Sequence, residues 1–529
     1  MLRKTATSLL LIISLCMISV LAFAQKQNNL SMQANKLGQT LFYIQKMYLD
    51  TANIETLTNK ALAAIVTELD PHSSYITKED IKAMDEPLVG NFDGIGVEFA
   101  LINDTLTINA TIPGGPSEKV GVRAGDKIVS VDDENIAGTS LTIERVHKYL
   151  RGPKGTKVKV GVVRKNEPQV LEFVITRDKI PLNSIDSYYE IEDRIIYVRL
   201  TRFAATSYEE LLNALQSVGV EPKGLILDLR GNSGGYLLTA IQIVNEFLHK
   251  GELIVYTEGR ALPRMDEYAD GNGLLQNIPL AILIDENSAS ASEIVSGAIQ
   301  DQDRGIIIGR RSFGKGLVQR QVPLPDGSAL RLTVARYHTP SGRVIQSPYE
   351  EGKKDEYYKQ IVERYARGEN FNRDSIHLAD SVVYRTVKQQ RPVYGGGGIM
   401  PDIFIPQDTT YYTPFYGEIL RKGLLTDYMN QYSDIHRASL LKKYPKVEQF
   451  VKKYTPSDAE ITGFLEYCAT KGVVPKEGDM EISGAEIRKY FKGLIIRSVY
   501  NFNSFIQFIN GDDKEILKAV EEIKALYNK

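Results

Sequence analysis

The chain has 529 residues, of which 43% are hydrophobic and 25% are charged, and its formal net charge at pH 7 is −2. This length and apolar content suffice for several hydrophobic cores, so we expect three or four domains. The near-zero net charge argues against nucleic acid or an anionic membrane as a general partner, and function must therefore be sought in motifs.

Residues 1–24 have the pattern of a secretory signal peptide. A basic start is followed by an apolar stretch over residues 8–21, and Ala22 and Ala24 supply the small residues before a cleavage site. The apolar stretch is shorter than the ~20 residues that a membrane span needs. The sequence therefore predicts export to the periplasm or cell envelope, with cleavage after Ala24. Removal of this segment leaves Cys468 as the only cysteine, which excludes an intramolecular disulfide.

Residues 25–85 predict a helical region that precedes the first domain. Between residues 37 and 69 the apolar side chains recur at intervals of three or four, which is the spacing of one helix face. The segment DPHSSY (70–75) then interrupts the pattern.

Within residues 86–178, a glycine-rich loop is followed by a turn-and-helix stretch and then by a predicted strand at 127–131. This order of features resembles a PDZ domain, a module that binds the C-terminal ends of peptides. Glycines in such a loop let backbone N–H groups converge on a terminal carboxylate, while the peptide adds as a strand and places an apolar side chain in a pocket. The loop residues that the resemblance assigns to carboxylate binding are Gly94, Ile95, Gly96 and Val97.

The next segment predicts the start of an α/β core. A buried strand over 225–229, the tight turn GNSGG (231–235) and a helix over 236–248 form a strand–turn–helix unit. Asp228 and Arg230 flank the turn, and we expect them to form a structural pair that holds it.

A second unit places a serine at a helix start and a lysine between two glycines. The apolar run 282–284 predicts a strand, and polar turn residues follow it before Ser290 opens a helix. Free N–H groups at that end stabilise an oxyanion, the N–H of Ala291 being the natural donor. Serine needs a base, and lysine serves as one only when desolvation keeps it neutral. The flanking glycines let the backbone close around Lys315, so we expect a serine–lysine peptidase site.

The rest of the chain is expected to complete this core and to extend it. Residues 347–391 carry a charged, tyrosine-rich stretch that predicts an inserted helical hairpin, and residues 392–406 predict a return into the core of residues 179–346. Residues 407–529 alternate helical patterns with lysine-rich faces and predict a helical extension. We expect this extension to pack on the core, and we keep homo-oligomerisation and adaptor binding as alternatives.

Four motifs make the chain resemble the carboxyl-terminal processing peptidases, the tail-specific S41 class of serine endopeptidases. They are DLRGNSGG (228–235), SASASE (288–293), FGKG (313–316) and GGGIMPD (396–402). The resemblance implies a multidomain α/β fold, in which an S41-type peptidase core follows a PDZ domain and has helical N- and C-terminal regions.

The resemblance also implies a role for each site residue. The nucleophile, the general base and the residue that orients the base are, in that order, Ser290, Lys315 and Gln319. The oxyanion hole would combine the N–H of Ala291 with an N–H from the Gly234–Gly235 pair, of which we favour Gly235.

The expected function is that of a serine endopeptidase which recognises the C-terminal tail of exported proteins and cleaves them through an acyl-enzyme. Its partners would be protein or peptide substrates with free tails, and no nucleic acid is expected. No cofactor or metal is expected either, because the six histidines are scattered and no H-E-x-x-H motif occurs.

Two alternatives remain open from the sequence. The turn GNSGG (231–235) matches the G-x-S-x-G nucleophile elbow of the α/β-hydrolases, so Ser233 could act with a downstream histidine, His249 or His338. The chain could also be a PDZ-bearing scaffold without activity.

Overall fold

The structure is a computed structural model that describes residues 29–527 apart from 113, 166 and 378–382. The signal peptide predicted for residues 1–24 lies outside the described residues. Among the helices that are described, none is long and apolar enough to cross a membrane. The chain divides into two compact units, and the described residues of the smaller one are 29–78, 321–332 and 350–354.

The smaller unit contains the predicted helical lead-in. The described part begins with a helix over residues 29–47, and α2 (Ile54–Thr67) follows after a break at which the Asn53 side chain caps the backbone N–H of Thr56. The short strand β1 (Ser74–Ile76) then pairs antiparallel with residues 329–331. The lead-in is thus helical as predicted, but it is split into two helices.

The segment that resembles a PDZ domain forms a six-stranded antiparallel sheet with two helices. The sheet contains β3 (Val97–Ile102), β4 (Thr105–Thr111), β5 (Lys127–Val131), β7 (Lys157–Val163) and β8 (Leu171–Thr176) in that order, and β6 (Glu134–Asn135) pairs with β5. The helices are α4 (Pro116–Val120) and α5 (Ile143–Leu150). A separate pair, β2 (Asn91–Gly94) with β9 (Asp178–Pro181), closes the segment, and α3 (Lys78–Val89) precedes it. The strand predicted at 127–131 is β5.

A six-stranded sheet forms the α/β core. Its strands, in spatial order, are β10 (Ile185–Glu192), β11 (Ile195–Leu200), β12 (Gly224–Asp228), β15 (Leu280–Ile284), β16 (Ile306–Gly309) and β21 (Ile403–Phe404). All neighbours are parallel except β10 and β11. Because the strands are parallel, their carboxyl ends lie along one edge, where ligand sites of such sheets are found.

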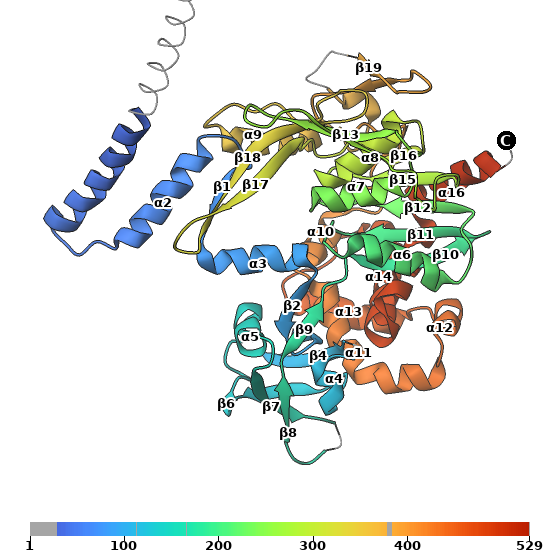
Figure 1. The fold of residues 1–529 in the computed structure, drawn as a ribbon. Helices are drawn as coiled ribbons and strands as arrows, with labels where there is room; N and C mark the ends of the chain where they lie inside the picture. The colour runs from blue at the N-terminus through green and yellow to red at the C-terminus, as the bar shows by residue number, and fades with distance from the viewer. Residues whose placement is uncertain (1–28, 113, 166, 378–382, 528–529) are drawn as a thin grey trace, which may run out of the picture. The chain divides into compact units, whose positions relative to one another are not determined.

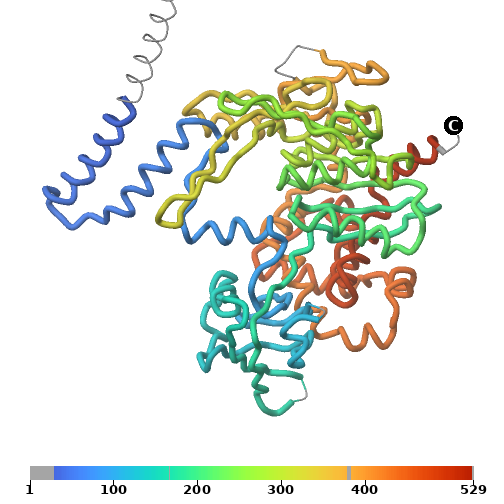
Figure 2. The backbone as a smooth tube through the Cα atoms, in the orientation of Figure 1, coloured from blue at the N-terminus to red at the C-terminus, as the bar shows by residue number. Residues whose placement is uncertain are grey.

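Helices cover both faces of this sheet, which explains why its central strands are continuous apolar runs. On β15, Ile282 and Ile284 belong to the hydrophobic cluster with α6 (Ser207–Val218), α7 (Leu237–Asn245) and α8 (Ala291–Asp301). The alternate residues Ala281 and Leu283 contact the opposite cluster, which includes residues of α15 (Phe502–Ile509) and α16 (Lys514–Tyr527). Figures 1 and 2 show α16, at the red end of the chain, beside the core strands. The end of the C-terminal extension therefore packs on the core.

A second sheet and an insertion complete the peptidase region of the chain. Besides β1, the sheet contains β13 (Leu253–Glu258), β14 (Met265–Tyr268), β17 (Leu317–Pro323) and β18 (Ala329–His338). The insertion contains α9 (Lys354–Ala366), the 3₁₀ turn η1 (Arg373–Ser375) and a β-hairpin of β19 (Val383–Arg385) and β20 (Pro392–Tyr394). The prediction of a helical hairpin is wrong for its second half, because β-branched and aromatic residues at 383–394 favour paired strands.

The remaining extension forms its own helical core. The helices are α10 (Pro414–Arg421), α11 (Leu424–Lys443), α12 (Val447–Lys453), α13 (Asp458–Thr470), α14 (Asp479–Ile495) and the π-helical turn η2 (Ile496–Tyr500). The side chains of Phe450, Phe464 and Phe491 are fully buried between them.

Candidate active site

Ser290 lies at the carboxyl edge of the core sheet, immediately before α8. The turn after β15 is held by the Asp285 carboxylate, which accepts the N–H groups of Asn287 at 3.0 Å and Ser288 at 3.1 Å. Ser290 itself has φ 54° and ψ −111°, and its side chain is half-buried. A non-glycine residue at this φ and ψ is strained, and such strain at a strand-to-helix turn is typical of a nucleophile elbow.

The turn after β12 lies directly against Ser290. A Cβ atom added to Gly234 would lie 2.8 Å from the Cβ of Ser290 and 3.0 Å from the backbone nitrogen of Ala291. The N–H of Gly234 donates to the Asn232 side chain at 2.9 Å. Within the part of the chain that the structure describes, the N–H groups of Ala291 and Gly235 have no acceptor. Both N–H groups therefore stay candidates for donors to an oxyanion at Ser290.

Glu293 connects the serine segment to the lysine segment. Its carboxylate is fully buried, and one oxygen accepts the backbone N–H groups of both Ser290 and Lys315, each at 2.8 Å. The other oxygen accepts the N–H of Gly314 at 2.7 Å and the hydroxyl of Ser312 at 2.5 Å. Burial raises the pKa of Glu293, although these hydrogen bonds oppose the shift.

A tyrosine makes the second connection between the same two segments. The Tyr337 hydroxyl donates to the carbonyl of Ser290 at 3.1 Å and to the carbonyl of Lys315. Burial raises the pKa of Tyr337 well above its usual value, so the phenol keeps its proton. The backbones of Ser290 and Lys315 are thus held together from both sides, by an acceptor and by a donor.

The glycines around Lys315 allow the close packing that the sequence predicts. Gly314 has φ 95°, and a Cβ atom there would lie 2.2 Å from the Ser347 hydroxyl oxygen. A Cβ atom on Gly316 would lie 2.8 Å from the backbone nitrogen of Gln346. Lys315, between these two glycines, is half-buried.

Gln319 lies on β17, two residues beyond the start of that strand. Its side-chain amide donates to the carbonyl of Leu317 at 3.3 Å, within its own strand. The contact that would orient the lysine amine is thus not among the hydrogen bonds of Gln319 in this structure, and its role stays a prediction.

The predicted pair of Asp228 and Arg230 is part of a larger network. Their side chains lie 2.6 Å apart, and the Tyr197 hydroxyl donates to Asp228 at 2.7 Å. Burial acts to raise the pKa of Asp228, but the charge and hydrogen bonds of Arg230 outweigh it and hold the pKa below its usual value. Glu515 of α16 contacts both Arg230 and Arg310 at 2.5 Å. The sequence showed no signal for this acid, because it lies more than 200 residues from its partners.

The strained backbone distinguishes Ser290 from Ser233. Ser233 is exposed and does not belong to the residues with positive φ. Of the two histidines offered by the α/β-hydrolase alternative, His249 hydrogen bonds to Gln276 at 3.0 Å, and His338 stacks on Tyr256 with ring centroids 4.4 Å apart. The geometry therefore does not favour that alternative.

The segment with the predicted carboxylate loop has the arrangement of a peptide groove. Gly94 ends β2, Gly96 has φ 74°, and Val97 begins β3, which is an edge strand of its sheet. The Ile95 side chain is buried in the core of this segment. Helix α5 lies beside β3, since the rings of Phe99 and His147 meet edge to face at 6.1 Å. An edge strand beside a helix is the place where a peptide can add as a further strand.

This combination of fold and site defines a serine-type peptidase with a PDZ domain. The model of Peptidase family S41 matches residues 194–352, and that of the PDZ domain matches residues 107–164. Residues 415–501 match a family of unknown function, DUF8443.

Curated relatives match more than half of the chain. The carboxy-terminal-processing protease of Bartonella bacilliformis is 38% identical over 328 residues, which cover 60% of this chain and 74% of the relative. A probable CtpA-like serine protease of Staphylococcus aureus is 32% identical over 59% of this chain and 62% of its own length. The chain belongs to peptidase family S41, together with these carboxy-terminal-processing proteases. The alternative of an inactive scaffold is therefore not favoured.

Solved structures show similarity as well. The photosystem II D1 C-terminal processing protease is 26% identical, with 70% of this chain and 88% of that chain covered and a TM-score of 0.35. The PDZ domain of the carboxy-terminal protease from Vibrio cholerae, solved in complex with a peptide, is 28% identical over 17% of this chain and 99% of that chain, with a TM-score of 0.16.

Proposed function

We propose that the protein cleaves exported proteins with a Ser290–Lys315 dyad after its PDZ domain has bound their free C-terminal tails. The observation that carries the proposal is the strained backbone of Ser290 at the start of α8, with one Glu293 oxygen binding the N–H groups of both dyad residues. Export is supported by the signal-peptide pattern of residues 1–24.

The chemistry follows from these positions. The neutral amine of Lys315 takes the hydroxyl proton of Ser290 as the serine oxygen attacks the substrate carbonyl. The oxygen of the tetrahedral intermediate receives hydrogen bonds from the N–H groups of Ala291 and Gly235. Lys315 then returns the proton to the leaving amine, and an acyl-enzyme remains. A water molecule, deprotonated by the same lysine, hydrolyses this ester.

Several features support Gly235 rather than Gly234 as the second donor. The N–H of Gly234 already donates to the side chain of Asn232, and a Cβ atom on Gly234 would collide with Ser290. We therefore propose that Gly234 allows the two turns to approach closely, and that Gly235 donates the hydrogen bond to the oxyanion. Gln319 is proposed to orient the amine of Lys315, as the resemblance implies.

Tail recognition is proposed for the loop of Gly94, Ile95, Gly96 and Val97 and for the edge strand β3. A substrate tail would add as a strand along β3, with its carboxylate at the loop and its last side chain against α5. Because the tail is held at the PDZ domain, the segment upstream of it becomes the substrate of the core.

The test is cleavage of an unfolded protein that ends in an apolar residue, with fragments identified by mass spectrometry. Wild type should produce fragments with and without EDTA, whereas Ser290→Ala should produce none. Cleavage by Ser290→Ala, or a loss of wild-type activity in EDTA that zinc restores, would contradict the proposed chemistry.

A further inference from the structure

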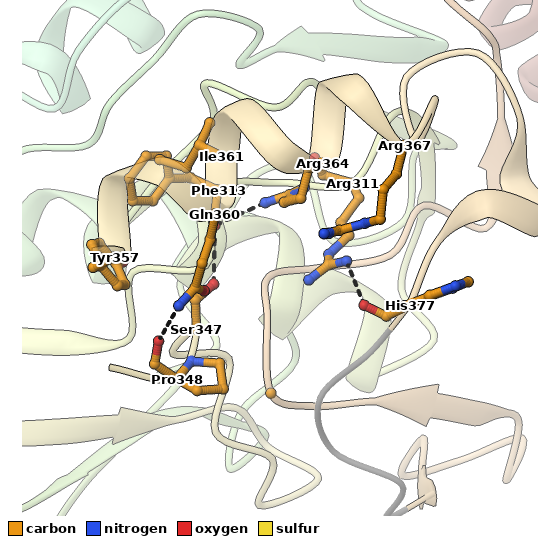
Figure 3. A pocket seen from close by; sticks show the side chains of 11 residues that line it. Arg311, Phe313, Ser347, Pro348, Tyr357, Gln360, Ile361, Arg364, Arg367 and His377 are labelled. Atoms are coloured by element: carbon orange, nitrogen blue, oxygen red, sulfur yellow. Dashed lines mark hydrogen bonds between the residues drawn. The ribbon is translucent and has the colours of Figure 1, made fainter. Parts of the chain in front are cut away.

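A cavity of about 390 Å³ lies between the insertion helix α9 and residues 311–313, which precede Lys315 in the chain. Figure 3 shows it between the side chains of α9 and the residues Phe313 and Ser347, which belong to two different segments. The size is within the range of small-molecule sites. None of the roles proposed above uses this cavity.

One wall of the cavity is unusually rich in positive charge. The guanidinium groups of Arg311, Arg364 and Arg367 converge on Glu369, with nitrogen–oxygen distances of 3.0, 3.3 and 2.9 Å. Within the described residues, Glu369 is the one carboxylate that forms an ion pair with Arg311 and Arg364. Arg367 also reaches the exposed Glu363 at 3.8 Å. The charge of Glu293, which is also buried, acts on Arg364 as well, so two buried carboxylates face three cations.

The buried arginines show the consequence of this imbalance. Arg311 and Arg364 are each only 7% exposed. Burial lowers the pKa of Arg311 to about 10, and the neighbouring charge of Arg364 adds to the effect. Uncompensated charge in a buried site is costly unless a counter-ion is supplied.

Part of the cavity lining is apolar. Phe313, Pro348 and Ile361 contribute to it, and Figure 3 shows them to one side of Arg311 and Arg367. A ligand that fills the cavity would thus need a charged end and an apolar body. Planar guanidinium groups bind carboxylates through paired hydrogen bonds.

We propose that this cavity binds an organic carboxylate with a compact apolar group, held by the guanidinium groups of Arg311 and Arg367 against the apolar side chains of Phe313 and Ile361. The site is coupled to the dyad by Arg364, which donates to the carbonyls of Arg311, Ser312 and Phe313 at 3.2, 3.0 and 3.1 Å. These three residues directly precede the Gly314–Lys315 turn. The source of the carboxylate is either the C-terminal residue of a peptide or a free organic acid.

Calorimetric titration of the full chain tests the site. N-acetyl-leucine should bind, and N-acetyl-leucinamide should not, because it lacks the charge. Arg367→Gln should weaken binding about tenfold, which is the loss expected for one charge-assisted contact. Arg367 is chosen because its side chain is 42% exposed and its replacement leaves the core intact. Arg373→Gln, an exposed change in the same insertion, is the matched control and should bind like wild type.

Two further arms separate this cavity from the PDZ loop and identify the source. Gly96→Leu should leave the affinity for N-acetyl-leucine unchanged if the ligand occupies the cavity. If 4-methylpentanoate binds with the same affinity as N-acetyl-leucine, the natural ligand is a free acid. If N-acetyl-leucine binds more tightly than 4-methylpentanoate, the ligand is the C-terminal residue of a peptide. The proposal is overturned if no carboxylate binds, if Arg367→Gln binds like wild type, if Gly96→Leu abolishes binding, or if inorganic phosphate binds as tightly as N-acetyl-leucine.

Discussion

The backbone N–H groups of Ser290 and Lys315 donate to the same oxygen of the Glu293 carboxylate, each over 2.8 Å. This shared acceptor holds the segment of Ser290 next to the segment of Lys315, although the two are separate in the chain. The position of the proposed nucleophile relative to its base depends on this buried oxygen together with the Tyr337 hydroxyl.

The first prediction is that Glu293→Gln lowers kcat by about 10²-fold, because small displacements of reacting groups cost that much. A glutamine presents an NH₂ group where one of the N–H donors needs an acceptor, so one segment must move. Steady-state kinetics with a tailed peptide would measure the loss. Glu221→Gln, which changes an exposed glutamate, should retain wild-type kinetics. Unchanged kcat in a folded Glu293→Gln variant would show that the shared oxygen is dispensable.

The second prediction concerns the dyad itself. Ser290→Ala and Lys315→Ala should each reduce cleavage by a factor on the order of 10⁴ or more, and the double variant should lose no more than either single one. Ser233→Ala should keep a measurable fraction of the activity, because its exposed hydroxyl lacks the strained backbone of Ser290. If Ser233→Ala is folded and as inactive as Ser290→Ala, the result would support the α/β-hydrolase alternative, in which Ser233 is the nucleophile.

The third prediction concerns the pH dependence of stability. The pKa of Glu293 is raised in the folded state by burial, so its contribution to stability is fully present below the unfolded glutamate pKa of about 4.3 and is lost as the pH rises through the raised value. The free energy of unfolding of wild type relative to Glu293→Gln should therefore fall as the pH rises from about 4.3. Urea denaturation at several pH values measures this difference. A difference that grows with pH would mean that the folded pKa is lowered instead.

The fourth prediction tests tail reading by the PDZ loop. Amidating the substrate C-terminus should slow cleavage, because the carboxylate loses its charge-assisted hydrogen bonds. Gly96→Leu should slow it too, since Gly96 has φ 74° and a Cβ atom would lie 3.0 Å from Ile180. Gly138→Asn is the matched control, because that glycine has φ 69° and no neighbour within 4 Å. Equal kcat/KM for amidated and free tails would exclude carboxylate reading.

The fifth prediction concerns the link between α16 and the oxyanion turn. Glu515→Ala should lower the free energy of unfolding by about 3 kcal/mol, because it removes the partner that the largely buried Arg230 and Arg310 share. Thermal and urea denaturation would measure the loss. Lys518→Ala should have little effect, because this side chain, which is 28% exposed, pairs only with Glu521 and Glu522 of the same helix among the described residues. A stability loss no larger than that of Lys518→Ala would mean that Asp513, which also contacts Arg230 at 2.8 Å, compensates fully.

Local patterns in the sequence were sufficient for the elements that carry the candidate site. The apolar run at 282–284 lies within β15, the predicted strand at 127–131 is β5, and the strand–turn–helix unit around GNSGG corresponds to β12 and α7. These elements follow from hydrophobic periodicity and turn residues, which act over a few neighbours. The insertion was predicted only in part, because the short strands at 383–394 depend on pairing with each other.

The sequence by itself determined the family, the order of the segments and the candidate residues Ser290 and Lys315, because motifs of glycine, serine and lysine specify local backbone and chemistry. Only the tertiary structure decided which serine is strained, which of Gly234 and Gly235 keeps its N–H available, and that Glu293 and Tyr337 hold the two segments together. It also placed Glu515 against Arg230. These relationships join residues far apart in the chain, and they arise from burial and hydrogen-bond satisfaction in the folded core, which no local pattern encodes.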